Sequence, residues 1–243
     1  MRRAFWVGLV ALLSVGCSAP AAAPQAPVEA GASATFKSAQ PARAEPDLPG
    51  TEAGDFDFYV LALSWSPTYC LDEGERADPL QCAPKRPYDF IVHGLWPQFE
   101  HGRVEECAGR APALKDDLVN SLLPIMPSRG LIRHEWRAHG QCSGLSAADY
   151  FAALRKARSM VHIPPAFDQP TRDKMTNPDA VERAFIAKNK GLEAAGIAVT
   201  CSGRRLREVR ICLTKSFEFR TCSSVDRRAC TRPEIVAPAS RGG

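Results

Sequence analysis

The chain has 243 residues, of which 45% are hydrophobic and 24% charged, a composition typical of a globular protein rather than a disordered or fibrous one. Its formal net charge of +4 at pH 7 permits a polyanionic partner without identifying one. No Cys-x-x-Cys pair occurs among the nine cysteines, which disfavours zinc ribbons and thioredoxin-like redox motifs.

The first residues have the pattern of an export signal. Two arginines precede an apolar run that ends at Val15 and is too short to span a bilayer permanently. Cys17 stands where bacterial lipoprotein signals place their lipidated cysteine, although Ser14 replaces the usual leucine. We therefore predict a signal peptide over 1–17 and a periplasmic or extracellular location, with a lipid anchor at Cys17 favoured over cleavage in the alanine-rich stretch or an unused thiol.

The next segment, 18–53, is rich in Ala and Pro and has few large apolar side chains, so we predict a disordered tether. Without internal repeats or breaks, the remainder predicts a single, monomeric folded domain over 54–230. Residues 231–243 are expected to form a short, loose tail.

Within this domain, an apolar run over 58–65 predicts a buried central strand, and 89–92 predicts a second strand leading directly into His93. Helical periodicity covers 113–125, 147–160 and 179–190, and strands return at 197–202 and 206–213. The order of strands, helices and strands predicts an α+β fold, with a central, mainly antiparallel sheet flanked by helices.

Apart from Cys17, the cysteines form an even set of eight, Cys70, Cys82, Cys107, Cys142, Cys201, Cys212, Cys222 and Cys230. In an exported protein such a set predicts four disulfides. The count of eight cysteines alone leaves all 105 possible disulfide pairings open.

Three of the five histidines fall in two compact segments, HGLWP beginning at His93 and HEWRAHGQC beginning at His134. A zinc hydrolase is one interpretation, but His134 and His139 are five residues apart and diverge by roughly 140° on an α-helix. Glu135 and His139 are four apart and share a helix face. This spacing favours acid–base chemistry over metal binding.

These two segments resemble the active-site segments of the ribonuclease T2 family, the acid ribonucleases that include plant S-type enzymes and bacterial periplasmic ribonucleases. The resemblance extends over 55–230, including GDFDFYVLALSWSPTYC at the start and CSGRRLREVRICL near the end. It implies a disulfide-stapled α+β domain that cleaves single-stranded RNA with broad base tolerance and without a metal or other cofactor.

The resemblance also implies residue roles. His139 is the expected general base toward the 2′-hydroxyl and His93 the general acid toward the leaving 5′-oxygen, with the roles reversed when the 2′,3′-cyclic phosphate is hydrolysed. Glu135 is expected to orient or charge-balance His139, and His134 to bind phosphate or help in protonation, although packing roles stay open for both. Trp96 is expected at the substrate cleft. Imidazole suits both transfers because its ordinary pKa is about 6.5.

One departure concerns the lysine that family members commonly carry just before the second histidine, because this chain has Ala138 there. Arg137 or Arg133 is the candidate replacement, and Arg137 the candidate substrate contact. A catalytically weakened RNA-binding or toxin-like surface protein is therefore the alternative function. Tyr69 and Gln98 are further candidate base contacts.

The family resemblance selects the disulfides Cys70–Cys82, Cys107–Cys142, Cys201–Cys230 and Cys212–Cys222. Arginines are also dense near the C-terminus, where a solvated surface and a phosphate-facing patch stay equal alternatives. They are Arg204, Arg205, Arg207, Arg210, Arg227 and Arg228.

Overall fold

The computed structural model describes residues 52–84, 86, 88–101, 107 and 111–240. The predicted signal peptide, Cys17 and nearly all of the predicted tether lie outside these residues. Among the described residues, no helix has both the length and the apolar character needed to cross a membrane.

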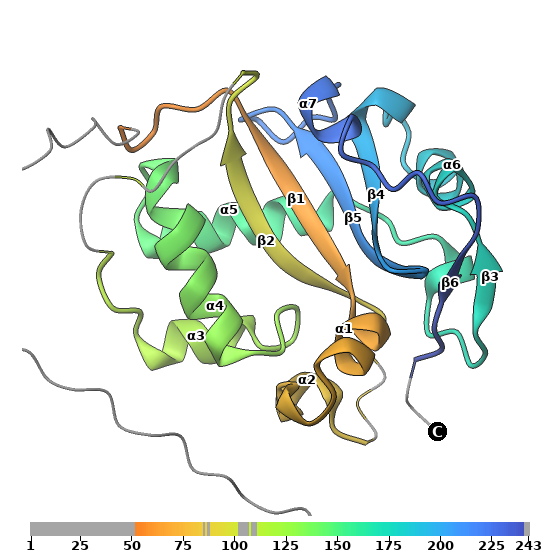
Figure 1. The fold of residues 1–243 in the computed structure, drawn as a ribbon. Helices are drawn as coiled ribbons and strands as arrows, with labels where there is room; N and C mark the ends of the chain where they lie inside the picture. Colours follow the sequence, from red (N-terminus) through yellow and green to blue (C-terminus); the bar gives the residue numbers. More distant parts are fainter. Residues whose placement is uncertain (1–51, 85, 87, 102–106, 108–110, 241–243) are drawn as a thin grey trace, which may run out of the picture. The chain divides into compact units, whose positions relative to one another are not determined.

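A six-stranded sheet organises the domain (Figure 1). Its main order is β2-β1-β5-β6-β3, and β4 also pairs with β5. All pairings are antiparallel except the single parallel contact between β5 and β6. The strands are β1 (Phe58–Trp65), β2 (Phe90–Gln98), β3 (Lys174–Thr176), β4 (Ile197–Ser202), β5 (Arg205–Leu213) and β6 (Ile235–Ala237).

The helices lie around this sheet: α4 and α5 contact β2, α3 packs against α4, and α6 contacts β4 (Figure 1). They are α1 (Ser66–Glu73), α2 (Pro79–Cys82), α3 (Asp116–Leu122), α4 (Arg129–Glu135), α5 (Ala147–Ser159), α6 (Pro178–Lys188) and α7 (Ser223–Asp226). The predicted α+β class is confirmed. The helix predicted over 113–125 is shorter: Leu123 still has helical dihedral angles, but Pro124 has no N–H with which to continue the α-helical hydrogen bonds.

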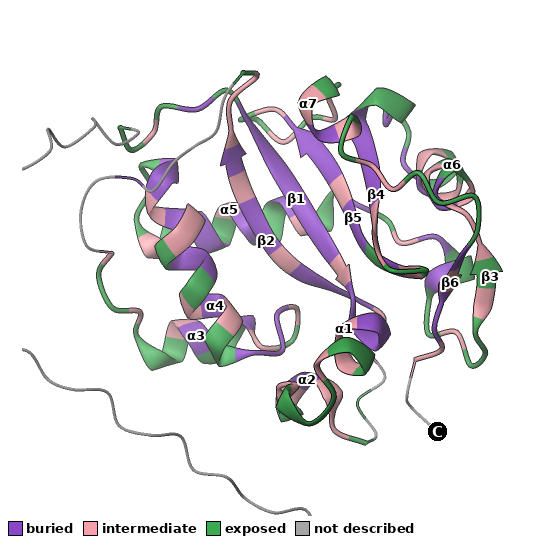
Figure 2. Cartoon of the chain, viewed as in Figure 1, coloured by how far each residue is buried: buried purple, intermediate pink, exposed green. Residues whose placement is uncertain are grey.

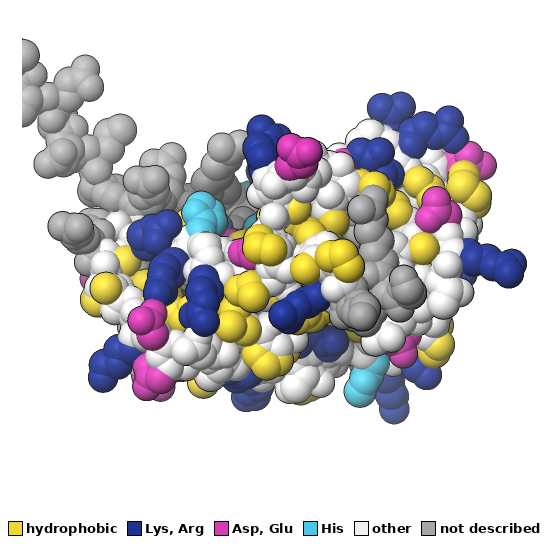
Figure 3. All heavy atoms as spheres, turned by 90° about the horizontal axis from the view of Figure 1, so that it is seen from below, with side chains coloured by type: hydrophobic (Ala, Val, Ile, Leu, Met, Phe, Trp, Pro, Cys, Tyr) yellow, Lys and Arg dark blue, Asp and Glu magenta, His cyan; other side chains and the backbone are white. Residues whose placement is uncertain are grey.

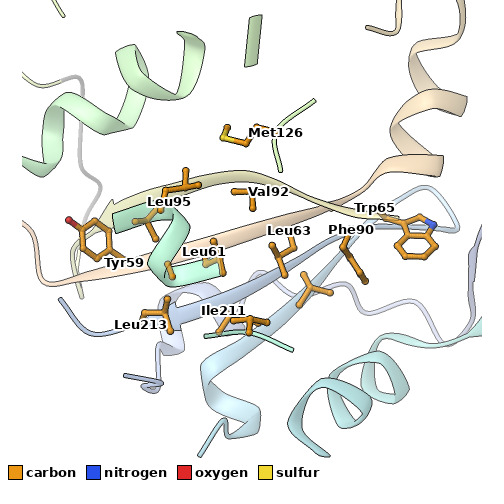
Figure 4. Close-up of a cluster of buried hydrophobic side chains, with 14 of the residues drawn as sticks. Tyr59, Leu61, Leu63, Trp65, Phe90, Val92, Leu95, Met126, Ile211 and Leu213 are labelled. Atoms are coloured by element: carbon orange, nitrogen blue, oxygen red, sulfur yellow. The ribbon is translucent and has the colours of Figure 1, made fainter. Parts of the chain in front are cut away.

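Both faces of β1 are covered, which explains its nearly continuous apolar sequence. Leu61, Leu63 and Trp65 enter the main core, and the alternate residues Phe58 and Val60 join a smaller cluster on the other face. Figure 4 shows the main-core side chains of β1 among those of its neighbours, and Figure 2 shows how fully the central strands are buried. The sheet is therefore a rigid base for side chains that project from it.

The structure corrects two predicted boundaries. The strand expected to end at Val92 continues through His93 to Gln98. The tail expected to be loose forms β6, in which Ile235 and Ala237 are buried. Trp65 also donates a hydrogen bond from Nε1 to the carbonyl of Pro238, at 3.0 Å. Tertiary contacts order this strand, and its three residues are too few to show a periodic pattern in the sequence.

The four disulfides are those that the family resemblance implies, Cys70–Cys82, Cys107–Cys142, Cys201–Cys230 and Cys212–Cys222. Cys107–Cys142 spans 35 positions and joins the segment after β2 to the turn that follows α4. It therefore links the two parts of the chain that carry the histidine segments.

Candidate active site

His93 lies at an irregularity in β2. Ala62 of β1 is opposite Gly94 and Leu63 is opposite Val92, so His93 is an extra residue without a direct partner. Such a bulge changes which face each following side chain occupies. Val92 and Leu95 can therefore both enter the core, while His93 stays partly exposed.

A buried carboxylate from β5 holds one side of the His93 ring. Glu208 is hydrogen-bonded to Nδ1 of His93 and is only 1% exposed. Burial raises the pKa of Glu208, but hydrogen bonding to His93 and the charges of His93 and Arg210 outweigh this and lower it to about 2. Glu208 is therefore an anion at any pH at which the protein is expected to work.

A second buried carboxylate lies beyond the other ring nitrogen. Oε1 of Glu135 is 3.5 Å from Nε2 of His93, and Oε2 accepts a 2.8 Å hydrogen bond from Nε1 of Trp96. Gly94 makes this approach possible, because a Cβ atom there would lie 1.9 Å from Oε2 of Glu135. Burial raises the pKa of Glu135 to about 7, against the opposing effects of His93 and Trp96.

The two carboxylates raise the pKa of His93. Burial alone lowers the pKa of His93, but the hydrogen bond and charge of Glu208, together with the charge of Glu135, raise it above the ordinary 6.5. His93 is therefore the imidazole whose protonated form this site favours.

His139 lies on a π-helical turn, Trp136–Gly140, that continues directly from α4. Its ring centroid is 5.4 Å from that of Trp96, whose ring is 5.2 Å from His93. Burial, with smaller contributions from the charges of His134 and His93, lowers the pKa of His139 to about 4. Trp96 thus lies against two imidazoles that prefer opposite protonation states.

Comparison with known proteins shows the family to which the chain belongs. The sequence model of the Ribonuclease T2 family matches residues 56–222, which include both histidine segments and Glu208. The chain belongs to the Ribonuclease T2 family. This membership indicates ribonuclease activity.

Individual ribonucleases align over most of the chain. A ribonuclease of Aeromonas hydrophila is 34% identical over 203 residues, which cover 76% of this chain and 86% of that protein. Ribonuclease I of Escherichia coli is 27% identical over 208 residues, or 68% of this chain and 77% of that protein. The solved structure of trichomaglin, described as an S-like ribonuclease, shares the fold with a TM-score of 0.62, 20% identity and coverage of 76% and 99%.

Glu135 contacts His93 and Trp96, not His139 as the sequence predicts. Glu135 was expected beside His139, but its hydrogen bond and ion pair are to Trp96 and His93. The prediction assumed a continuous α-helix from 134 to 139. The wider π-turn, with i→i+5 geometry, begins immediately after Glu135 and changes the direction in which His139 projects.

A cavity of about 570 Å³ opens beside His93. His134 and Tyr69 line it with the charged side chains of Asp72, Glu73, Arg207 and Glu208, together with the neutral polar side chains of Ser64, Thr68, Gln81 and Ser128. Gln98, the other candidate base contact, does not line it, and its side-chain amide donates to the carbonyl of Pro97. Among the described residues, no group of three or more His, Cys, Asp or Glu side chains is arranged to hold a metal ion.

The two arginines considered as replacements for the missing lysine point elsewhere or stay in solvent. Arg133 donates a 2.7 Å hydrogen bond to Asp116, and Arg137 is exposed on the π-turn. Neither has an interaction with His93 or His139 in the part of the chain that the structure describes. Ala138 itself is partly buried.

The arginines near the C-terminus do not form one patch. Arg204 pairs with Glu234, Arg205 pairs with Asp72, and Arg207 lines the cavity. On the face shown in Figure 3, Lys and Arg side chains lie in several separate groups among hydrophobic side chains. Near the candidate site, Arg207 lines the cavity, Arg205 binds the cavity residue Asp72, and Arg210 binds Glu208.

Glu208 is the site residue that sequence reasoning missed. It lies within the arginine-rich stretch, where an acidic side chain is easily interpreted as a surface charge partner. No local pattern marked it, because only the pairing of Glu208 with Ser64 of β1 places this carboxylate in the buried site.

Proposed function

We propose that this protein is an endoribonuclease that cleaves single-stranded RNA by transesterification, with His139 as general base and His93 as general acid. The observation that carries this proposal is the contrast between the two imidazoles on either side of Trp96. His93 lies between two carboxylates, whereas His139 has no carboxylate partner among the described residues.

The reaction balances without a cofactor. Neutral His139 takes the proton of the 2′-hydroxyl, whose oxygen attacks the adjacent phosphorus while the bond to the 5′-oxygen breaks. Protonated His93 gives its proton to that leaving oxygen. The product is a 2′,3′-cyclic phosphate, and hydrolysis by water uses the same groups in reversed roles.

The cavity beside His93 supports binding of a base or sugar next to the scissile phosphate. Its neutral hydroxyl and amide groups offer donors and acceptors to any base, in keeping with broad base tolerance. His134 faces this space as the proposed phosphate contact, Trp96 packs between the imidazoles, and Arg137 is the proposed solvent-side substrate contact.

Export is part of the proposal, because four disulfides persist mainly in oxidising compartments. We further propose that the segment 1–17 is the export signal and that Cys17 is the lipid attachment point, with periplasmic or extracellular action as a monomer. Replacing Cys17 with Ala and labelling cells with a fatty-acid analogue distinguishes anchoring from simple cleavage.

A matched pair of substrates tests the mechanism. An RNA oligonucleotide should be cut to fragments with 2′,3′-cyclic ends, and the same sequence with a single 2′-deoxy residue should resist cleavage only at that position. Mass spectrometry of the fragments reports both results. Cleavage at the 2′-deoxy position would contradict the proposal, because no internal nucleophile is present there.

The pH dependence follows from the two histidines. His139 is neutral above its pKa of about 4, and His93 is protonated below a pKa that lies above 6.5. We expect kcat/KM to rise with pH through about 4 and to fall only above 6.5. Initial rates on a dinucleotide, with a melting curve recorded at each pH, check this. A decline beginning below 6.5 in folded protein would contradict the assigned roles.

Ala138 leads to a separate prediction. Because no described arginine takes the place of a lysine there, Ala138→Lys should raise kcat by up to about 10²-fold, the effect of one well-placed donor on a developing charge. Ala148→Lys, an exposed position on α5, is the control for added charge. An unchanged kcat would show that the site already has its cation, and very low wild-type turnover rescued by Ala138→Lys would favour the weakened-enzyme alternative.

A further inference from the structure

Glu208 is a buried anion whose two oxygens have different partners. Oε1 accepts from Ser64 Oγ at 3.2 Å and is bonded to Nδ1 of His93. Oε2 accepts from Nε and Nη2 of Arg210, at 3.0 and 2.9 Å. Because an ionised carboxylate is strongly destabilised in a protein interior unless both oxygens are bonded, this complete set of partners fixes its position.

The bond to Nδ1 determines what the His93 ring can do. With Nδ1 bonded to an anion, the ring keeps a proton there, and Nε2 is the nitrogen left to exchange a proton with substrate. We infer that Glu208 is the positioning residue of the general acid: it fixes the tautomer and orientation of His93 and stabilises its cationic form. This inference rests on the proposed function, in which His93 donates the proton to the leaving oxygen.

Arg210 adds a fixed positive charge next to Glu208. Its guanidinium lies 5.1 Å from the centre of the Trp96 ring while it shares the Glu208 carboxylate with His93. The positive charge of Arg210 acts on His93 in the opposite direction to Glu208. Removing Glu208 and removing Arg210 should therefore change the protonation of His93 with opposite signs.

Two other titratable groups also affect the protonation of His93. Glu135 of α4 faces Nε2, and His139 of the π-turn interacts with His93 electrostatically. Both stay in place when β5 is changed. A difference between Glu208 and Arg210 variants therefore reports on the β5 pair.

The experiment compares Glu208→Gln and Arg210→Gln with the wild type. Glu208→Gln should lower kcat at neutral pH by at least about tenfold, with KM changed less than about threefold, because only proton donation is impaired. The alkaline limb of its pH profile should move to lower pH. The alkaline limb of Arg210→Gln should move to higher pH. Glu234→Gln, which breaks the exposed pair with Arg204, is the matched control and should leave the profile unchanged.

A second measurement needs no substrate. The imidazole signals of His93 can be titrated by NMR in the same proteins, and the midpoint should fall in Glu208→Gln and rise in Arg210→Gln. Glu208→Asp keeps the charge and should return the midpoint toward the wild-type value. If Glu208→Gln does not fold, the Arg210→Gln and Glu208→Asp titrations decide.

The outcomes separate the two proposals. Unchanged His93 midpoints, or shifts of the same sign in Glu208→Gln and Arg210→Gln, would overturn the positioning role even if the wild type produces cyclic phosphate. Opposite shifts in the two variants, combined with a wild type that leaves neither 2′,3′-cyclic phosphate nor 3′-phosphate ends, would retain the Glu208–His93 coupling and refute the transesterification mechanism. A loss of activity in Glu208→Gln with an unmoved alkaline limb would show a purely structural effect.

Discussion

His93→Ala and His139→Ala should each lower kcat/KM by about 10²- to 10⁴-fold, the usual contribution of one acid–base catalyst. His93→Ala removes the proton donor to the leaving oxygen, and His139→Ala removes the acceptor for the 2′-hydroxyl proton. Rates on a dinucleotide and thermal melting curves measure the effects on catalysis and folding separately.

The two variants should differ in stability. His93→Ala deprives the buried Glu208 of one partner and should reduce the unfolding free energy by about 1–3 kcal/mol, whereas His139→Ala has no such effect. His162→Ala is the control, since His162 is exposed and lines a separate cavity with Asp89 and Arg158. Near-wild-type turnover in either active-site variant would refute the role assigned to that histidine.

Replacing both Cys107 and Cys142 with Ser should reduce the unfolding free energy by about 4 kcal/mol, the loop-entropy value for a crosslink over 35 positions. Activity should fall further than stability explains, because this disulfide links the segments carrying His93 and His139. Denaturant unfolding gives the free energy, and rates measured where the variant is fully folded give the effect on the site.

The Cys201–Cys230 pair provides the matched control. It spans 29 positions, so its removal should reduce the unfolding free energy by nearly the same amount. It joins β4 to the segment before β6 and does not line the cavity beside His93. Equal losses of activity in the two double variants, with both folded, would contradict a special role for Cys107–Cys142.

The sequence predicted the parts of the fold that depend on local patterns. The periodic helices α5 and α6 and the alternating β5 could be recognised because burial of one face leaves a regular spacing, and β1 because burial of both faces leaves a continuous apolar run. The histidine segments were also recognisable, because each places its reactive residues close together in the sequence and resembles a segment of a known family.

The contacts within the site depend on geometry that spacing does not reveal. The bulge at His93 arises from pairing with β1, and the π-turn after Glu135 breaks the α-helical periodicity on which the expected Glu135–His139 contact was based. Glu208 reaches His93 from 115 positions further along the chain. Its role depends on strand register, which no local pattern records.

The pairing of β1 with β5 also governs how the protein reaches its native state. Tyr59 lies opposite Leu213, and β5 in turn meets β6 near the end of the described chain. A ribosome-bound chain that has made only its first half therefore has β2 to pair with one edge of β1, but the other edge of this apolar strand still lacks its partner β5. Contacts this distant in sequence make folding slow and leave such strands open to aggregation. Chaperone protection during synthesis is thus a foreseeable requirement, and recombinant yield should depend on it.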